Sequence, residues 1–221
     1  VLEQRCVVCH ACYDSPCQLN MTAWEGLARG ANPDQVYALR RAAVDPTRLF
    51  VDAQTPAEWQ NRGFHPVLNE RENSPQANLA GSVLYQLLQM KRDNPLPQQA
   101  VLSDKDFSFE LDRKQTCTSI EEIDSYAEKH PQWGMPYGLP ALSDQEFSVL
   151  EKWLANGAPA KELEPLPQAL NAQIADWETF LNGNTNKQRL MSRYIYEHLF
   201  LGHIYFDEID AAENRPVFFR L

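Results

Sequence analysis

The feature that most constrains this chain is the segment RCVVCHACYDSPC at residues 5–17, which holds four of its five cysteines. Cys6, Cys9 and His10 form the pattern C-x-x-C-H, the attachment motif of a c-type haem. Two residues between the thiols let one short helical turn present both sulfurs to the vinyl groups at one porphyrin edge, and the adjacent histidine then lies beneath the iron. The sequence therefore predicts one covalently bound haem c, with His10 as the proximal ligand.

Two other kinds of site use the same residue types. A thioredoxin-like redox pair should follow a strand inside a βαβ unit, and the sequence shows no such unit. A zinc site with four ligands would have Cys12 and Cys17 close at hand. The downstream segment favours haem, because GMPYGLPALSDQEFSVLEKWLANGAP at residues 134–159 resembles the C-terminal half of a class I cytochrome c.

The second axial ligand is predicted to be Met135, which stands in a Gly- and Pro-bounded loop just before a capped amphipathic helix. The other methionines follow apolar periodicities and are interpreted as core residues. The alternative distal ligands are the remaining histidines, each of which fits a structural or surface position better: His65, His130, His198 and His203.

Three cysteines lie outside the attachment motif. Haem c is attached outside the reducing cytosol, so Cys12, Cys17 and Cys117 are expected in an oxidising compartment. Cys12 could pair with Cys17, or either of them with Cys117, and the sequence does not choose between these pairings. Three free thiols are the remaining alternative.

Helix-capping patterns recur along the chain and indicate a mainly α fold. Residues able to cap a helix N-terminus precede apolar residues at helical spacing at four places: Thr55, Ser74, Ser119 and Ser143. The spacing predicts helices over 75–91, from Ser143 to a left-handed Gly157, over 170–182 and over 186–202. Short extended pieces are predicted at 47–53 and 216–221, a loop at 92–115 and a linker at 158–168.

These elements predict a cytochrome c-like haem domain over residues 1–159 and a helical extension over 160–221. His10 and Met135 are further apart in sequence than a minimal cytochrome c requires, so residues 45–115 are interpreted as a large helical insertion. The chain opens almost directly on the cysteine motif, without a signal peptide. We therefore expect the natural protein to continue beyond both ends of this sequence.

The net charge of −10 argues against nucleic-acid binding, which rests on clustered Lys and Arg. It also argues against polybasic docking to an anionic membrane, so a contact with lipid would have to come from apolar burial. The most apolar stretch, YIYEHLFLGHIYF at 194–206, is too short to span a bilayer. The sequence contains no glycine-rich phosphate loop, and no nucleotide is expected.

Four segments together resemble the bacterial fatty acid cis–trans isomerases, which are periplasmic c-type cytochromes of Gram-negative bacteria. The segments are RCVVCHACYDSPCQLNMTAWEGLARGA, PTRLFVDAQTPAEWQNRGFHPVL, GMPYGLPALSDQEF and RYIYEHLFLGHIYF. The resemblance implies conversion of cis-unsaturated acyl chains of membrane phospholipids to trans, which stiffens the membrane under solvent or heat stress. It also implies that ferric haem draws electron density from the alkene, so that the weakened π bond rotates without net redox change.

Carried onto this chain, the resemblance implies that Cys6 and Cys9 attach the haem and that His10 ligates its iron. Residues 194–206 and the helix 75–91 are interpreted either as the lining of an acyl path or as core helices. Two other functions fit a haem domain. One is an electron-transfer cytochrome, and the other is a peroxidase-like or sensor module, against which a bound Met135 would count.

Overall fold

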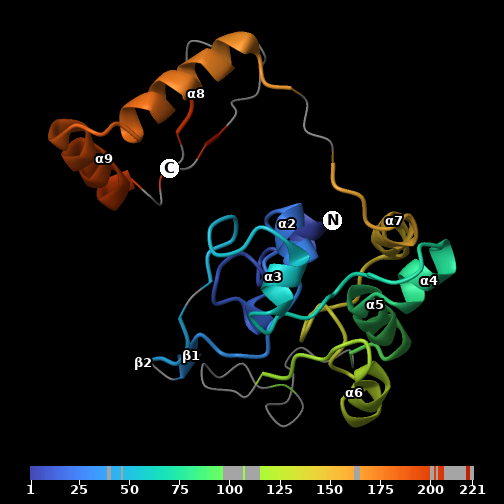
Figure 1. Cartoon of the computed structure of the whole chain (residues 1–221). Coiled ribbons are helices and arrows are strands. Elements are labelled where there is room, and N and C mark those ends of the chain that lie inside the picture. Colours follow the sequence, from blue (N-terminus) through green and yellow to red (C-terminus); the bar gives the residue numbers. More distant parts are fainter. Residues whose placement is uncertain are drawn as a thin grey trace. The chain divides into compact units, whose positions relative to one another are not determined.

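The computed structural model describes residues 1–38, 41–45, 47–96, 107, 115–161, 165–199, 202, 204–206 and 218–219. The chain divides into two compact units, residues 1–160 and 161–221 (Figure 1). The described residues are mainly helical, which confirms the predicted class, and their regular strands form one short antiparallel pair.

The first unit holds most of the secondary structure. Its helices are α1 (Leu2–Arg5), the 3-10 helix η1 (Pro16–Gln18), α2 (Trp24–Arg29), α3 (Pro56–Gln60), α4 (Pro75–Ala80), α5 (Val83–Asp93), α6 (Ile123–Lys129) and α7 (Asp144–Ala155). Strand β1 (Tyr37–Ala38) pairs with β2 (Arg41–Ala42).

Three of the predicted N-caps are confirmed. The Thr55 side chain accepts a hydrogen bond from the Glu58 N–H at the start of α3, and Ser74 caps α4 in the same way. Ser143 forms a reciprocal capping box with Glu146 at the start of α7. These caps could be predicted from the sequence because each one satisfies a backbone N–H group within three residues of itself.

The single helix predicted over 75–91 is wrong, because the structure contains two helices separated at Gly81. A side chain at Gly81 would lie 2.4 Å from Asn69 Oδ1, so another segment presses against the chain there. The Ser82 hydroxyl donates to the Val67 carbonyl at 3.1 Å and accepts from the Tyr85 N–H, which starts α5 anew.

Two further local predictions need correction. Ser119 does not cap α6, since Glu122 N–H bonds the Ser119 carbonyl in a turn and the helix begins at Ile123 without a side-chain cap. Residues 47–53 form a turn rather than an extended piece, with Phe50 in the left-handed region at φ 72°. Of residues 216–221 the structure describes two, and Phe219 forms an isolated bridge with Ile204.

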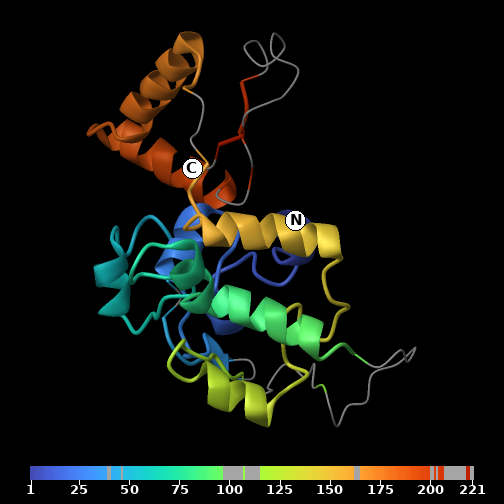
Figure 2. The ribbon, with the colours of Figure 1, turned by 90° about the vertical axis from the view of Figure 1, so that its right-hand side faces the viewer.

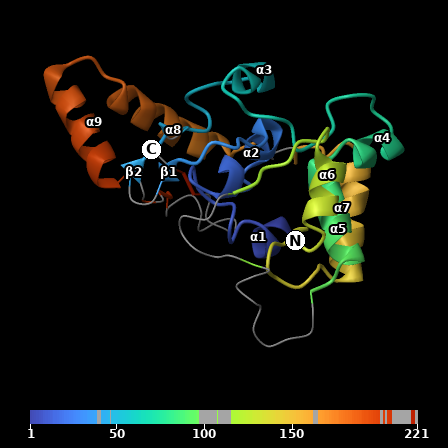
Figure 3. The same cartoon turned by 90° about the horizontal axis from the view of Figure 1, so that it is seen from below.

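The core of the first unit joins segments from both of its ends. Helices α5 and α7 lie side by side, with α6 against α5 and α4 against α7 (Figures 2 and 3). The buried cluster consists of Leu19, Met21, Leu27, Ala31, Val67, Val83, Leu84, Leu88, Phe147, Leu150, Leu154 and Ala158. Because α5 supplies three of these residues, the structure favours a core role for this helix.

Arg5 links the N-terminal helix to the loop before α7. Its guanidinium donates to the Ala141 carbonyl at 3.1 Å and pairs with Glu146 at 3.6 Å. Half-buried Cys6 and Met135 both pack against the core cluster. The cysteine motif and the Met135 loop therefore contact the same core.

The second unit contains α8 (Gln168–Leu181) and α9 (Asn186–Leu199), which pack on each other. Both helices were predicted, and α9 ends at Leu199, before residues 200, 201 and 203, which lie outside the described residues. Among the described residues of this unit, Leu170 is the only buried one. In the part of the chain that the structure describes, no helix has the length and apolarity needed to cross a bilayer.

Candidate functional site

The cysteine motif folds as one turn directly after α1. The N–H groups of Cys9 and His10 both bond the Cys6 carbonyl, at 3.1 and 3.0 Å. The thiols of Cys6 and Cys9 are free, the first half-buried and the second exposed. Two thiols and one imidazole thus leave the backbone within a single turn.

The His10 side chain is held in one orientation. Its Nδ1 lies 3.1 Å from the Leu19 carbonyl oxygen, which can only accept, so the Nδ1–H donates. Burial lowers the pKa of His10 and favours the neutral ring, whose lone pair is then on Nε2. Metal-bound histidines are oriented in this way, with the second ring nitrogen donating to a carbonyl. The donor set therefore fits a haem iron.

The loop that supplies this carbonyl, residues 15–19, has an unusual backbone. Cys17 and Gln18 are both left-handed, at φ 56° and 48°, a conformation that non-glycine residues adopt rarely. The Ser15 hydroxyl donates to the same Leu19 carbonyl at 2.7 Å, and the Asn32 N–H donates to the Cys17 carbonyl at 2.8 Å. These bonds fix the loop beneath the imidazole.

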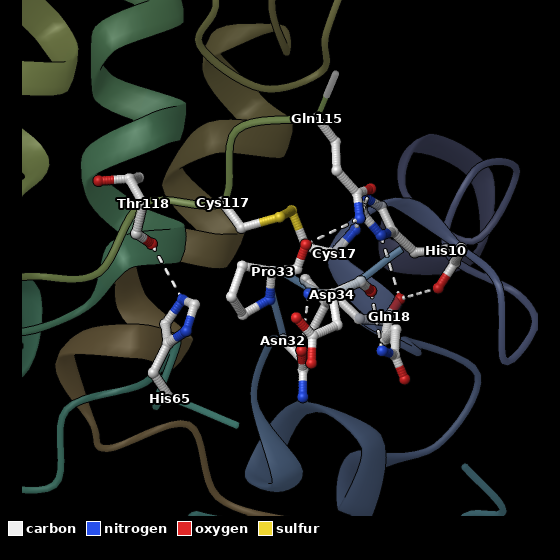
Figure 4. Close-up of a disulfide and its surroundings, with 12 residues drawn as sticks. His10, Cys17, Gln18, Asn32, Pro33, Asp34, His65, Gln115, Cys117 and Thr118 are labelled. Carbon is white, nitrogen blue, oxygen red and sulfur yellow. Dashed lines mark hydrogen bonds between the residues drawn. A yellow bond between two sulfur atoms is a disulfide. The ribbon is translucent and has the colours of Figure 1, made fainter. Parts of the chain in front are cut away.

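A disulfide ties this loop to a distant segment. Cys17 is bonded to Cys117, with 5.7 Å between their Cα atoms, and the Cys17 N–H donates to Gln115 Oε1 at 3.0 Å (Figure 4). Of the pairings that the sequence left open, the structure thus contains the long-range one, with Cys12 free and exposed.

The disulfide also bears on the zinc alternative, because it takes Cys17 out of the set of possible thiolate ligands. Cys6 and Cys9 are free thiols rather than a redox disulfide. Among the described residues, no group of three or more His, Cys, Asp and Glu is arranged to hold a metal ion.

The Met135 loop is fixed against α5. The Met135 N–H donates to the Leu87 carbonyl at 2.9 Å. A side chain on Gly134 would lie 2.3 Å from the Lys91 backbone nitrogen, so only glycine permits this close approach. The half-buried Met135 side chain therefore has a defined position against the core.

The described competing histidines all have structural partners. His65 Nε2 lies 3.1 Å from the Thr118 carbonyl oxygen, and His130 stacks on Trp133 with 3.9 Å between ring centroids. His198 belongs to α9, where its Nδ1 contacts the Tyr194 carbonyl at 2.7 Å. His203 lies outside the described residues.

Sequence reasoning missed two buried cations. The Arg29 guanidinium lies against the rings of both Trp59 and Phe64, which pack edge to face on each other. Lys91 is fully buried, and desolvation lowers its pKa to about 8. Neither residue belongs to a motif or interrupts an apolar period, so no sequence pattern predicted their burial.

The comparison with known families decides the identity. The family model for fatty acid cis/trans isomerase (CTI) matches residues 44–221, more than half of the 221-residue chain. The chain belongs to the fatty acid cis/trans isomerase family. No curated protein and no solved structure matches it significantly.

Membership of the fatty acid cis/trans isomerase family indicates cis–trans isomerisation of fatty acids, and it confirms the resemblance found in the sequence. The match includes Met135 and all helices from α3 to α9. It leaves out residues 1–43, and with them Cys6, Cys9 and His10. The haem motif is thus a separate observation, independent of the family match.

Proposed function

We propose that this isomerase converts cis-unsaturated acyl chains of membrane phospholipids to trans, with a haem c attached to Cys6 and Cys9. The observation that carries the proposal is the His10 imidazole, whose Nδ1–H is bonded to the Leu19 carbonyl while Nε2 keeps its lone pair. The family match supports the reaction class, and the C-x-x-C-H motif is the reason for proposing haem c as the cofactor.

Rotation about a double bond is blocked by its π component. When bound, haem supplies an electron acceptor that can draw density from that bond, which lowers the barrier to rotation. Such a reaction has no net redox change and consumes no nicotinamide. The remaining tasks fall to this chain's own residues.

His10 would coordinate the iron through Nε2, and its bond to Leu19 fixes the ring plane and raises the basicity of that nitrogen. Cys6 and Cys9 would form the thioether bonds. Met135 is proposed as the second residue that would hold the iron, because its loop is fixed to α5 and packs on the same core as Cys6.

The disulfide supports a place outside the reducing cytosol, and we propose the periplasm of a Gram-negative bacterium. There the product would act on the membrane itself. A trans chain is straighter than a cis chain and packs more tightly, so its formation would stiffen the bilayer under solvent or heat stress.

Contact with the membrane is assigned to an exposed strip on α9, defined by Leu190, Met191 and Tyr194. Tyr194 follows Leu190 by four residues and Met191 by three, so the three side chains lie on one side of the helix. Of their surfaces, 68%, 39% and 57% are exposed for Leu190, Met191 and Tyr194. Although the chain is acidic overall, α9 carries three basic residues and a single carboxylate. Apolar burial at a phospholipid surface therefore meets little charge repulsion here.

Replacing Leu190 and Tyr194 together by aspartate should lower the fraction of protein bound to phospholipid vesicles by at least about tenfold, since burying one large apolar side chain contributes about 1.5–3 kcal/mol. Co-sedimentation measures this fraction. The matched control is Val149→Asp, at an exposed apolar position of α7. An equal loss of vesicle binding in the control, or unchanged binding of the double variant, would contradict the proposal that this strip contacts the membrane.

The function itself is tested with haem-loaded protein and vesicles of phospholipid bearing cis-monounsaturated chains. Gas chromatography of the released fatty esters should show trans product that increases with time. An electron-transfer cytochrome would give a similar visible spectrum and no trans ester. That result, from a preparation with full haem content, would reject the isomerase proposal.

A further inference from the structure

Arg29, the last residue of α2, is a buried cation without an anion. Only 3% of its surface is exposed, and its guanidinium lies 5.2 Å from the ring centroid of Trp59 and 4.7 Å from that of Phe64. Its hydrogen bonds go to neutral groups, the Gln18 carbonyl and the Thr47 hydroxyl. Among the described residues, no carboxylate pairs with it and its Nε has no partner.

Burying the Arg29 guanidinium costs free energy unless an anion pairs with it. A buried charge is normally paired, because the desolvation penalty is offset only by a counter-charge with good hydrogen bonds. The aromatic faces of Trp59 and Phe64 compensate part of this penalty. Burial nevertheless lowers the pKa of Arg29 to about 10, as expected for a guanidinium without an anion beside it.

The position of Arg29 connects it to the candidate haem site. Its Nη2 donates to the carbonyl of Gln18, and the next carbonyl, that of Leu19, accepts the Nδ1–H of His10. The guanidinium and the imidazole therefore bind two consecutive carbonyl groups of the loop 15–19.

We propose that Arg29 binds a carboxylate of the haem and is its counter-ion, with Nε–H as one donor. This inference rests on the haem of the proposed function. Haem carries carboxylates, whereas an acyl chain esterified in a phospholipid has lost its own. A carboxylate here satisfies both the free Nε–H and the unpaired charge, in the charge-assisted geometry that guanidinium favours.

The test compares the holo-protein with Arg29→Met and Arg29→Lys by spectroelectrochemical titration of the haem. Removing the cation leaves a negative carboxylate uncompensated, which favours ferric iron, so Arg29→Met should have a lower reduction potential than the wild type. Arg29→Lys should restore most of that potential. The matched control Arg62→Met removes the same charge from an exposed side chain and should leave the potential unchanged.

The remaining outcomes separate the possible roles. A role limited to holding Gln18 and Thr47 predicts lower stability for Arg29→Met with an unchanged potential, and this result would overturn the inference. Weaker binding of free cis-unsaturated fatty acid, again with an unchanged potential, would assign Arg29 to a ligand carboxylate instead and would also overturn it. A protein that takes up no haem would reject the proposed function itself.

Discussion

Replacing His10 by alanine is expected to lower the rate of trans product formation by more than about 100-fold. Changing merely a partner of a metal ligand costs about 10–100-fold, and His10 is the proposed ligand itself. In the proposed site the thioether bonds would depend on Cys6 and Cys9 rather than on His10, so covalently attached haem should persist in the variant. Chromatography of fatty esters measures the rate, and the absorbance of the denatured protein measures the haem content.

The matched control is His130→Phe. This variant keeps an aromatic ring against Trp133 and should retain nearly full activity. If Met135 is the second iron ligand, as proposed, Met135→Ala should keep its haem while its visible spectrum loses the features of methionine ligation. If His10→Ala retained more than about a tenth of the wild-type rate with full haem content, the chemistry would lie elsewhere.

Removing the disulfide by replacing Cys17 and Cys117 with serine should lower the free energy of unfolding of the first unit by about 4–5 kcal/mol. The bridge joins residues 100 apart, and closing a loop of that length restricts the unfolded chain by about this amount. The double variant also frees the loop 15–19 that presents the Leu19 carbonyl to His10. Urea titration followed by haem absorbance measures the effect.

Cys12→Ser is the matched thiol variant, since Cys12 is exposed and free. Its effect should stay within about 0.5 kcal/mol, the usual range for surface substitutions. If Cys12→Ser lowered the free energy of unfolding as much as the double variant does, the loss could not be attributed to the bridge between Cys17 and Cys117.

Sequence patterns were informative wherever the causes are local. Thr55 and Ser143 cap helices because the N–H groups that they satisfy lie within three residues. The break at Gly81 was missed because its cause is Asn69, a residue of another segment. The extended piece predicted at 47–53 failed for a different reason, since apolar letters do not reveal a left-handed Phe50.

The candidate site shows the same limit. The motif predicts Cys6, Cys9 and His10 as site residues, but it does not predict the backbone carbonyl of Leu19 that orients His10. The pairing of Cys17 with Cys117 depends on how the chain returns on itself. Arg29 was missed because its significance comes from what surrounds it: two aromatic rings and no carboxylate among the described residues.

The core of the first unit is built from both of its ends, and this sets an order of events during synthesis. Cys6 and Cys9 leave the ribosome long before α7, which supplies Phe147, Leu150 and Leu154 to the core against which Cys6 packs. Long-range contacts of this kind close slowly. Both thiols are thus accessible on an open chain before folding half-buries Cys6. Under the proposed function, haem would be attached to this open segment, and the later folding of α7 would then enclose it.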